Sequence, residues 1–214
     1  MIKYMNLIGI KARKASEYKV ATEVKNKVLN DYAKLIKNEK KFIINQNSKD
    51  INYARKKGLK ENLIKRLHLN ENKLDGIINS ILKIAKLRDP IDNTLDKWKR
   101  PNGLNIKRVS IPIGVIGVIY ESRPNVTSDV ASLCFKSGNV VILKGGSEAI
   151  NSNKALAELF RKALKKNNEC ARGLSSFTSD EVTKIMGHHS NEIEKLLGYV
   201  AKSEVIHKDD MVEI

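Results

Sequence analysis

Two short apolar runs separated by a helical pattern dominate the middle of the chain. Residues 114–120 are almost continuously apolar with Val and Ile prominent, which is typical of a parallel strand covered on both faces. Residues 140–143 repeat this character, so a second short strand is predicted there. Between the strands, apolar residues recur at spacings of three and four, which predicts a helix over 125–136 whose apolar face holds Val126, Val130, Leu133 and Cys134. The pattern predicts a βαβ unit with residues 114–120 as a central strand.

A loop with two glycines follows the second predicted strand and precedes a helix predicted over 149–166. Ligands of open α/β sheets bind beyond the carboxyl ends of the strands, which is where this loop would lie. Its glycines let backbone amides approach an anion, Lys144 adds a positive charge, and the helix start adds the positive end of its dipole. The spacing matches neither G-x-G-x-x-G nor G-x-x-x-x-G-K-[ST], so spacing alone leaves a nucleotide-binding loop and a plain strand-to-helix turn as alternatives.

Polar residues also follow the first predicted strand, at the same edge of the sheet. Ser122, Arg123 and Asn125 stand where the strand gives way to the helix. They could bind a substrate, or they could serve as turn and helix-cap residues. Both interpretations stay open on the residues alone.

The first ninety residues have helical periodicity throughout and predict a helical layer. Apolar residues spaced by three and four between Ala21 and Leu35 predict an amphipathic helix over 19–37, and Gly58 is expected to end the next helix. Asn70 is a predicted N-cap for a helix that ends near Arg88, because Pro90 disfavours helical geometry just before it. Further on, the Asn102-Gly103 pair predicts a hairpin turn leading into a strand, against which Trp98 is expected to pack.

Length and composition indicate a globular chain. Its 214 residues allow one domain or one and a half, and a 41% hydrophobic content is enough to form a core. The longest apolar stretch, 109–120, is too short and interrupted for a membrane span, and residues 1–10 lack the pattern of a signal peptide. Two cysteines without a disulfide pattern are typical of a reducing compartment. We therefore expect a cytoplasmic protein with no membrane segment.

The net charge of +16 raises the question of nucleic-acid binding. The lysines are spread over the whole chain, and aromatic residues for base stacking amount to 5%. Specific nucleic-acid binding is therefore not expected. The positive balance would also favour an anionic cofactor or an acyl phosphate substrate.

Four stretches together resemble one enzyme family. They are GLKENLIKRLHLNENKL at 58–74, RPNGL at 100–104, PIGVIGVIYESRPNVT at 112–127 and ILKGGSEA at 142–149. Over residues 1–168 the chain resembles gamma-glutamyl phosphate reductase, also called glutamate-5-semialdehyde dehydrogenase, of the aldehyde dehydrogenase superfamily. The resemblance implies an α/β fold, namely part of an aldehyde-dehydrogenase-like cofactor-binding domain with an N-terminal helical layer. It also implies NADPH-dependent reduction of gamma-glutamyl phosphate to glutamate-5-semialdehyde in proline biosynthesis.

The resemblance assigns roles at both loops. Lys144 stands where the superfamily has a lysine that touches the cofactor's adenosine ribose, and Gly145, Gly146, Ser147 and Glu148 complete this NADP-binding loop, which would be a weak or partial site here. Asn125 stands where the superfamily has an asparagine that stabilises an oxyanion. Ser122 and Arg123 are assigned to the substrate side with it. The hairpin region belongs to the family's subunit-contact arm, which implies a homo-oligomer or pairing with an intact reductase.

The reaction needs a thiolate nucleophile, and the family's cysteine-bearing region is not matched. Cys134 is expected to be buried and structural, and Cys170 has no catalytic neighbours in the sequence. No catalytic residue is therefore assigned, and we expect the chain to be inactive alone. The alternatives are a non-catalytic cofactor-binding or subunit-pairing module and a nonfunctional fusion remnant.

Residues 169–214 change character and are predicted to form a small separate α/β tail. They resemble the C-terminal end of glutamate 5-kinase through ARGLSS, SDEVTKI, SNEIEKLLGY and EVIH, although Lys208, Asp209 and Asp210 depart from that family's pattern. This part of the kinase carries no catalytic residue. His188, His189 and Glu192 have helical spacings suited to a metal, but no third strong ligand is evident, so no metal site is expected. The junction suggests the hypothesis of a deletion between neighbouring genes.

Overall fold

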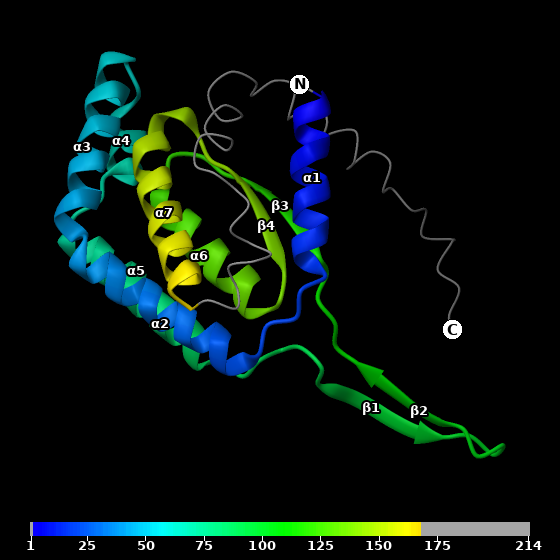
Figure 1. The fold of residues 1–214 in the computed structure, drawn as a ribbon. Coiled ribbons are helices and arrows are strands. Elements are labelled where there is room, and N and C mark those ends of the chain that lie inside the picture. Colours follow the sequence, from blue (N-terminus) through cyan, green and yellow to red (C-terminus); the bar gives the residue numbers. More distant parts are fainter. Residues whose placement is uncertain (1, 168–214) are drawn as a thin grey trace.

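The computed structural model describes residues 2–167 and places a small parallel sheet among helices (Figure 1). The predicted tail domain, 169–214, lies outside the described residues. The helices are α1 (Ile2–Ser16), α2 (Thr22–Asn38), α3 (Lys40–Lys56), α4 (Glu61–Leu67), α5 (Glu71–Lys86), α6 (Pro124–Lys136) and α7 (Ile150–Lys166). The strands are β1 (Thr94–Lys99), β2 (Asn105–Val109), β3 (Val115–Ile119) and β4 (Val140–Lys144), and a 3-10 turn spans Ser147–Ala149.

The predicted βαβ unit is confirmed. β3 and β4 pair in parallel from Val115↔Val140 to Ile119↔Lys144, and α6 connects them. Gly138 ends α6 in the left-handed region at φ 69°, as its C-terminal glycine predicts, and the amide of Asn139 returns to the carbonyl of Cys134. The helix predicted over 149–166 is also present as α7. These elements bring the two predicted loops to one edge of the sheet.

Two layers of helices cover one face of this sheet. α6 contacts β4, α7 packs beside α6, and α2, α3 and α5 form the outer layer (Figure 1). The main core lies between these layers and includes Val28, Leu29, Tyr32, Ile36, Leu74, Ile81, Phe135, Leu156 and Leu159. α2 corresponds to the helix predicted over 19–37, and the side chain of Asn70 caps α5 by accepting from the Lys73 amide at 2.9 Å.

The prediction of one helical layer over the first ninety residues is wrong for α1. This helix packs on the opposite face of the sheet from α6, beside β3 and β4 (Figure 1). Ala12 and Ala15 contact Val140 there, with Val115 and Ile142 beside them. Small side chains allow the helix to approach the strands closely. Helices from different parts of the chain therefore lie on the two faces of the sheet.

The predicted apolar face of α6 is only partly correct. Cys134 is buried as expected, but Leu133 is 49% exposed and Val126 and Val130 are only partly buried. The buried face instead includes Thr127 and Ser128. These hydroxyls are buried because they have hydrogen-bond partners: Ser128 bonds to the Tyr32 hydroxyl at 2.8 Å, and Thr127 bonds to Asn153 and Tyr120.

The prediction that residues 114–120 form a central strand covered on both faces is not met in the described part of the chain. β3 pairs only with β4 among residues 2–167, and its residues are half-buried or exposed. Gly117 and Ile119 are exposed, since α1 covers only the start of the strand. The apolar sequence of β3 thus exceeds the burial that the described elements provide.

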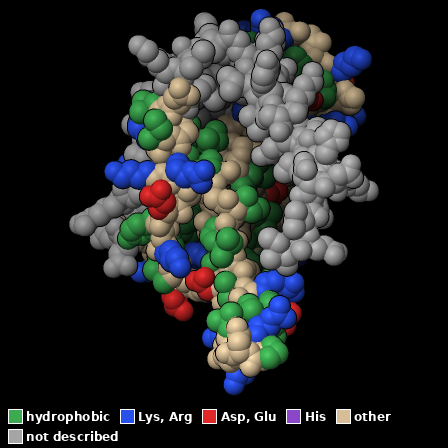
Figure 2. Space-filling view, turned by 90° about the vertical axis from the view of Figure 1, so that its right-hand side faces the viewer, with side chains coloured by type: hydrophobic (Ala, Val, Ile, Leu, Met, Phe, Trp, Pro, Cys, Tyr) green, Lys and Arg blue, Asp and Glu red, His purple; other side chains and the backbone are tan. Residues whose placement is uncertain are grey.

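β1 and β2 form an antiparallel hairpin that projects away from the rest of the molecule (Figure 1). Asn102 and Gly103 lie in its turn as predicted, and Trp98 of β1 faces Ile106 of β2. Every residue of β1 is exposed. On the face shown in Figure 2, basic side chains are spaced out with hydrophobic and acidic side chains between them. Within residues 2–167 no helix combines the length and apolar character needed to cross a bilayer.

Candidate functional site at the carboxyl ends of the parallel strands

The two loops singled out in the sequence lie side by side at the carboxyl ends of β3 and β4. Ile119 and Lys144 are register partners, and the Tyr120 amide donates to the Lys144 carbonyl at 3.0 Å, which extends the pairing to the last residue of β4. The chain then enters the Ser122–Asn125 turn on one side and the Gly145–Glu148 loop on the other. The topology therefore brings the predicted substrate and cofactor residues to one edge.

A carboxylate ties the two loops together. Oε1 of Glu148 accepts from the Ser122 amide at 2.8 Å and from the Ser122 hydroxyl at 2.7 Å. Ser122 is buried, and Glu148 is half-buried. Two donors on one carboxylate oxygen fix the position of the side chain and of the loop that carries it. Ser122 thus acts as a structural link to the cofactor loop, a role that the sequence did not indicate.

The same contacts determine the ionisation of Glu148. Burial by itself raises the pKa of this carboxyl, but the hydrogen bonds from Ser122 and the charge of Lys144 act the other way and hold the pKa below its ordinary value. Lys144 is half-buried at the end of β4. A lysine and an ionised carboxylate at one strand end are suitable hydrogen-bond partners for the hydroxyls of a ribose.

We expect the Ser122–Glu148 link to stabilise the fold above about pH 4.3, the unfolded value for Glu, and to weaken as the pH falls through the lower folded pKa. The sign follows because the ionised form is the one that accepts both hydrogen bonds. Urea unfolding midpoints between about pH 6 and about pH 3 should fall more steeply with acidification for the original chain than for Glu148→Gln. Glu158→Gln, at an exposed glutamate of α7, is the control. Identical slopes for the original chain and Glu148→Gln would contradict the assignment.

The glycines of the loop are required by packing within the protein. A Cβ on Gly145 would collide with the carboxamide of Asn153 and would lie 3.0 Å from Cζ of Tyr120. A Cβ on Gly146 would collide with the Glu148 carboxylate, which folds back over it. Gly145 itself is buried, whereas Ser147 is exposed. The loop therefore lies flat on Tyr120 and Asn153.

The expected contribution of the α7 dipole to ligand binding is wrong. The first turn of α7 donates to Asp50 of α3, whose Oδ1 accepts from the Asn151 amide at 3.0 Å and whose Oδ2 accepts from the Ser152 amide at 2.8 Å. The side chains of Asn151 and Ser152 donate to the same carboxylate at 2.7 and 2.6 Å. The positive end of the helix is thus neutralised inside the protein and is not offered to an anion. No local sequence signal indicates this contact, because 101 residues separate Asp50 from Asn151.

The other two predicted substrate residues, Arg123 and Asn125, make no hydrogen bond to the Ser122–Glu148 link. Arg123 precedes α6 and its side chain is exposed. The Asn125 carboxamide donates to Oδ2 of Asp129, one turn further along α6, at 3.2 Å. Burial raises the pKa of Asp129, and its Oδ1 is buried without a hydrogen-bond partner. The structure does not join Asn125 to the Ser122–Glu148 link by a hydrogen bond.

Nucleophile and metal chemistry find no support in the described residues. Cys134 is the free cysteine of this part of the chain, it is buried, and burial raises the pKa of its thiol, which keeps it protonated. No cluster of three His, Cys, Asp or Glu side chains suited to a metal ion occurs within residues 2–167. Cys170, His188, His189 and Glu192 lie outside the described residues.

Comparison with solved structures shows which class of protein has this fold. A putative aldehyde dehydrogenase from Bacillus subtilis matches 72% of this chain with a TM-score of 0.52 at 19% identity, and 32% of that protein is covered. At this identity the likeness concerns the fold alone. The described residues thus have part of an aldehyde dehydrogenase fold, as the sequence predicted.

Gamma-glutamyl phosphate reductases are the more similar proteins. The structure of the Thermotoga maritima enzyme matches 74% of this chain with a TM-score of 0.71 at 42% identity. The reductase of Aliarcobacter butzleri is 53% identical over 144 residues, which are 67% of this chain. No family model matches the chain. The N-terminal part of the chain is therefore homologous to gamma-glutamyl phosphate reductases, and its fold is a portion of theirs.

The chain spans well under half of these relatives. It covers 35% of the Aliarcobacter butzleri protein and 39% of the Thermotoga maritima structure. The likeness of the tail to glutamate 5-kinase is not among these findings and stays a prediction.

Proposed function

We propose that the chain binds NADP(H) through the loop Lys144–Glu148 and does not complete the reductase reaction by itself. The Ser122–Glu148 link carries this proposal, since it holds an ionised carboxylate beside Lys144 at the carboxyl edge of the sheet. The related enzyme class reduces gamma-glutamyl phosphate to glutamate-5-semialdehyde in proline biosynthesis. The chain would retain a part of that enzyme's cofactor site.

The residues present suit the adenosine ribose of the cofactor. Lys144 can donate to ribose hydroxyls and Glu148 can accept from them, and Gly145 and Gly146 allow the loop to pack closely on Tyr120, Asn153 and the Glu148 carboxylate. Because Asp50 occupies the start of α7, the cofactor's phosphates would have to lie elsewhere. When bound, NADPH would supply the hydride for the reduction.

The thiol chemistry of the described residues supports the proposed lack of turnover. The family route needs a thiolate to displace phosphate from the acyl group. Cys134 is buried in α6 with a raised pKa, so it is neither accessible nor ionised near neutral pH. The retained residues would then bind and orient a cofactor without a covalent partner for the substrate.

The proposal predicts a thermal shift with NADPH in the complete 214-residue chain. Ligand that binds only the folded state stabilises it by about 2.7 kcal/mol at 100 times Kd, so a rise in Tm with NADPH concentration is expected. Lys144→Ala should abolish the rise, and Lys97→Ala, at an exposed lysine of β1, should leave it unchanged. In the same preparation, phosphate-dependent oxidation of glutamate-5-semialdehyde with NADP should be undetectable.

Each other outcome has a defined meaning. Turnover would contradict the claim that the chain lacks a nucleophile, and the variants Cys134→Ser and Cys170→Ser would then identify the reacting thiol. No shift with NADPH in a chain that unfolds cooperatively would refute cofactor binding. A chain that is insoluble or unfolds without cooperativity would favour the fusion remnant.

A second candidate function is subunit pairing through the hairpin. β1 and β2 project from the body (Figure 1). The hairpin and the residues just after it expose large apolar side chains, namely Leu95, Trp98, Leu104, Val109, Ile111 and Ile113. Such surface is typical of an interaction site. A tagged chain should then co-elute with the intact Aliarcobacter butzleri reductase, and Trp98→Ser should weaken this, whereas Tyr53→Ser on α3 should not. Equal recovery of both variants would exclude the hairpin as the contact.

A further inference from the structure

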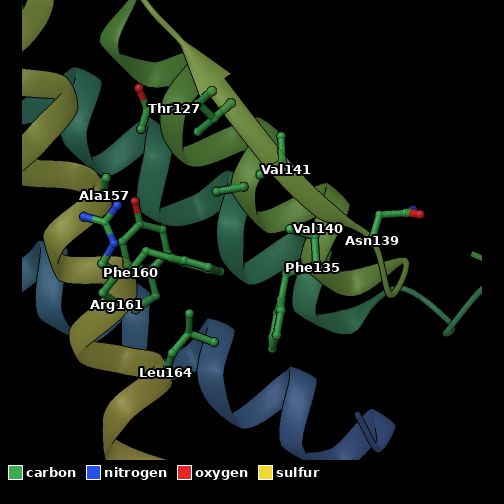
Figure 3. Close-up of a pocket in the computed structure, with 12 residues that line it drawn as sticks. Thr127, Phe135, Asn139, Val140, Val141, Ala157, Phe160, Arg161 and Leu164 are labelled. Carbon is green, nitrogen blue, oxygen red and sulfur yellow. The ribbon is translucent and has the colours of Figure 1, made fainter. Parts of the chain in front are cut away.

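An apolar pocket opens between β4, α6 and α7 (Figure 3). Its volume is about 150 Å³, and it is lined mainly by apolar side chains, among them Phe135, Val141, Leu143, Phe160 and Leu164. Arg161 and Thr127 supply polar groups to the lining. Apolar surface of this kind is normally covered in a folded domain.

The edge of β4 next to this pocket has no partner in the described part of the chain. Within residues 2–167, β4 pairs with β3 alone. Parallel strands are normally buried and flanked, and an open edge leaves backbone amides and carbonyls without strand partners. The pocket and the edge therefore meet at β4, and both are of a kind that is normally buried in a folded domain.

The chain leaves α7 beside this surface. Leu164 in the last turn of α7 and Val140 at the start of β4 line the same pocket. Lys166 and Asn167 are held against Asp31 of α2 by hydrogen bonds of 3.0 Å each, which fixes the point of exit. After a helix that packs on a sheet, the chain most often continues beside the strand that precedes the helix. The described part of the chain thus ends one turn beyond Leu164, which lines the pocket.

The charge of the following residues complements that of the body. Residues 168–214 contain nine acidic and five basic residues, a net charge of −4, so the net +16 of the whole chain leaves +20 for residues 1–167. Opposite charges favour their association. The segment also contains apolar residues for the pocket, among them Leu196, Leu197, Tyr199, Val200, Val205 and Ile206.

We propose that residues 168–214 of the same chain cover the pocket and the open edge of β4. The segment follows α7, whose Leu164 lines the pocket, so its effective concentration there is in the millimolar range, which gives it an advantage over a second copy or another protein. This inference does not depend on cofactor binding.

Photo-crosslinking of the complete chain tests the proposal. p-Benzoylphenylalanine replaces Arg161, which lines the pocket, and in a matched control replaces Lys162, which is exposed on the next position of α7 and pairs with Glu158. Because position 161 lines the pocket and position 162 is exposed outside it, illumination should give about tenfold more intramolecular product with residues 168–214 from position 161 than from position 162. A third variant with the crosslinker at Ala157, also in the pocket lining, should give the same peptides.

Other products would overturn the proposal. Crosslinks between two copies would assign the surface to a dimer. Crosslinks confined to residues 2–167, or equal yields of tail peptides from positions 161 and 162, would show that the segment does not cover the pocket. Circular dichroism of each variant confirms that the helices are retained before the yields are compared.

Discussion

Asp50→Ala is expected to lower the free energy of unfolding by about 3 to 4 kcal/mol, which is the largest effect of any single substitution that we predict. The reason is that each buried donor left without an acceptor costs about 1 to 3 kcal/mol. The Asp50 side chain is 1% exposed and accepts four hydrogen bonds from Asn151 and Ser152. Alanine would leave these donors without an acceptor and would remove the carboxylate that caps the start of α7.

Urea unfolding monitored by circular dichroism measures this effect. Asp75→Ala is the matched control, because Asp75 is 52% exposed and pairs with Lys40 at the surface. Exposed ion pairs contribute about 0 to 1 kcal/mol, so the control should change stability little. A loss below about 1 kcal/mol for Asp50→Ala would mean that α7 does not depend on this cap.

Gly145→Ala is expected to destabilise the fold by about 2 kcal/mol, because overpacking of a filled interior costs about 1 to 3 kcal/mol. The new methyl group would meet the Asn153 carboxamide and the Tyr120 ring. Tyr120 and Thr127 are hydrogen-bonded, and Thr127 donates to Asn153 at 3.0 Å, so none of the three can move independently. The loop should lift, and the Ser122–Glu148 link should weaken with it.

Gly76→Ala provides a control with the opposite sign. Gly76 lies within α5, and a Cβ there meets nothing within 4 Å. Alanine should stabilise this helix by about 0.5 to 1 kcal/mol. Thermal unfolding of both variants in parallel separates the effects, and equal shifts for the two glycines would refute the packing role of Gly145.

The helices and strands of this chain could be predicted well because their signals are local. Asn70 caps α5, Gly138 ends α6, and the apolar runs at β3 and β4 are short and bounded. The two loops could be assigned to one edge because parallel strands end on the same side. These features depend on neighbours in the sequence or on a simple topological rule.

The contacts that shape the site could not be predicted because they join distant residues. Ser122 and Glu148 were both singled out, but nothing in the sequence indicated that one bonds to the other. In the sequence Asp50 is one polar residue of a predicted helix, and its role as the acceptor for the α7 amides is visible only in the folded structure. Ser128 and Thr127 belong to the buried face of α6, which the sequence did not predict, since their partners come from α2, α7 and the end of β3.

The placement of α7 has a consequence for how the chain folds. The core of the early helices is completed by this late helix, since the Tyr32 hydroxyl donates to the Leu156 carbonyl across 124 residues and Asp50 meets Ser152 across 102. Such contacts close long loops, and a high contact order slows folding. During synthesis, α2, α3 and α5 would leave the ribosome well before their packing partner. The nascent chain would therefore expose the apolar residues that α7 covers until α7 emerges, and chaperones would be needed during this interval.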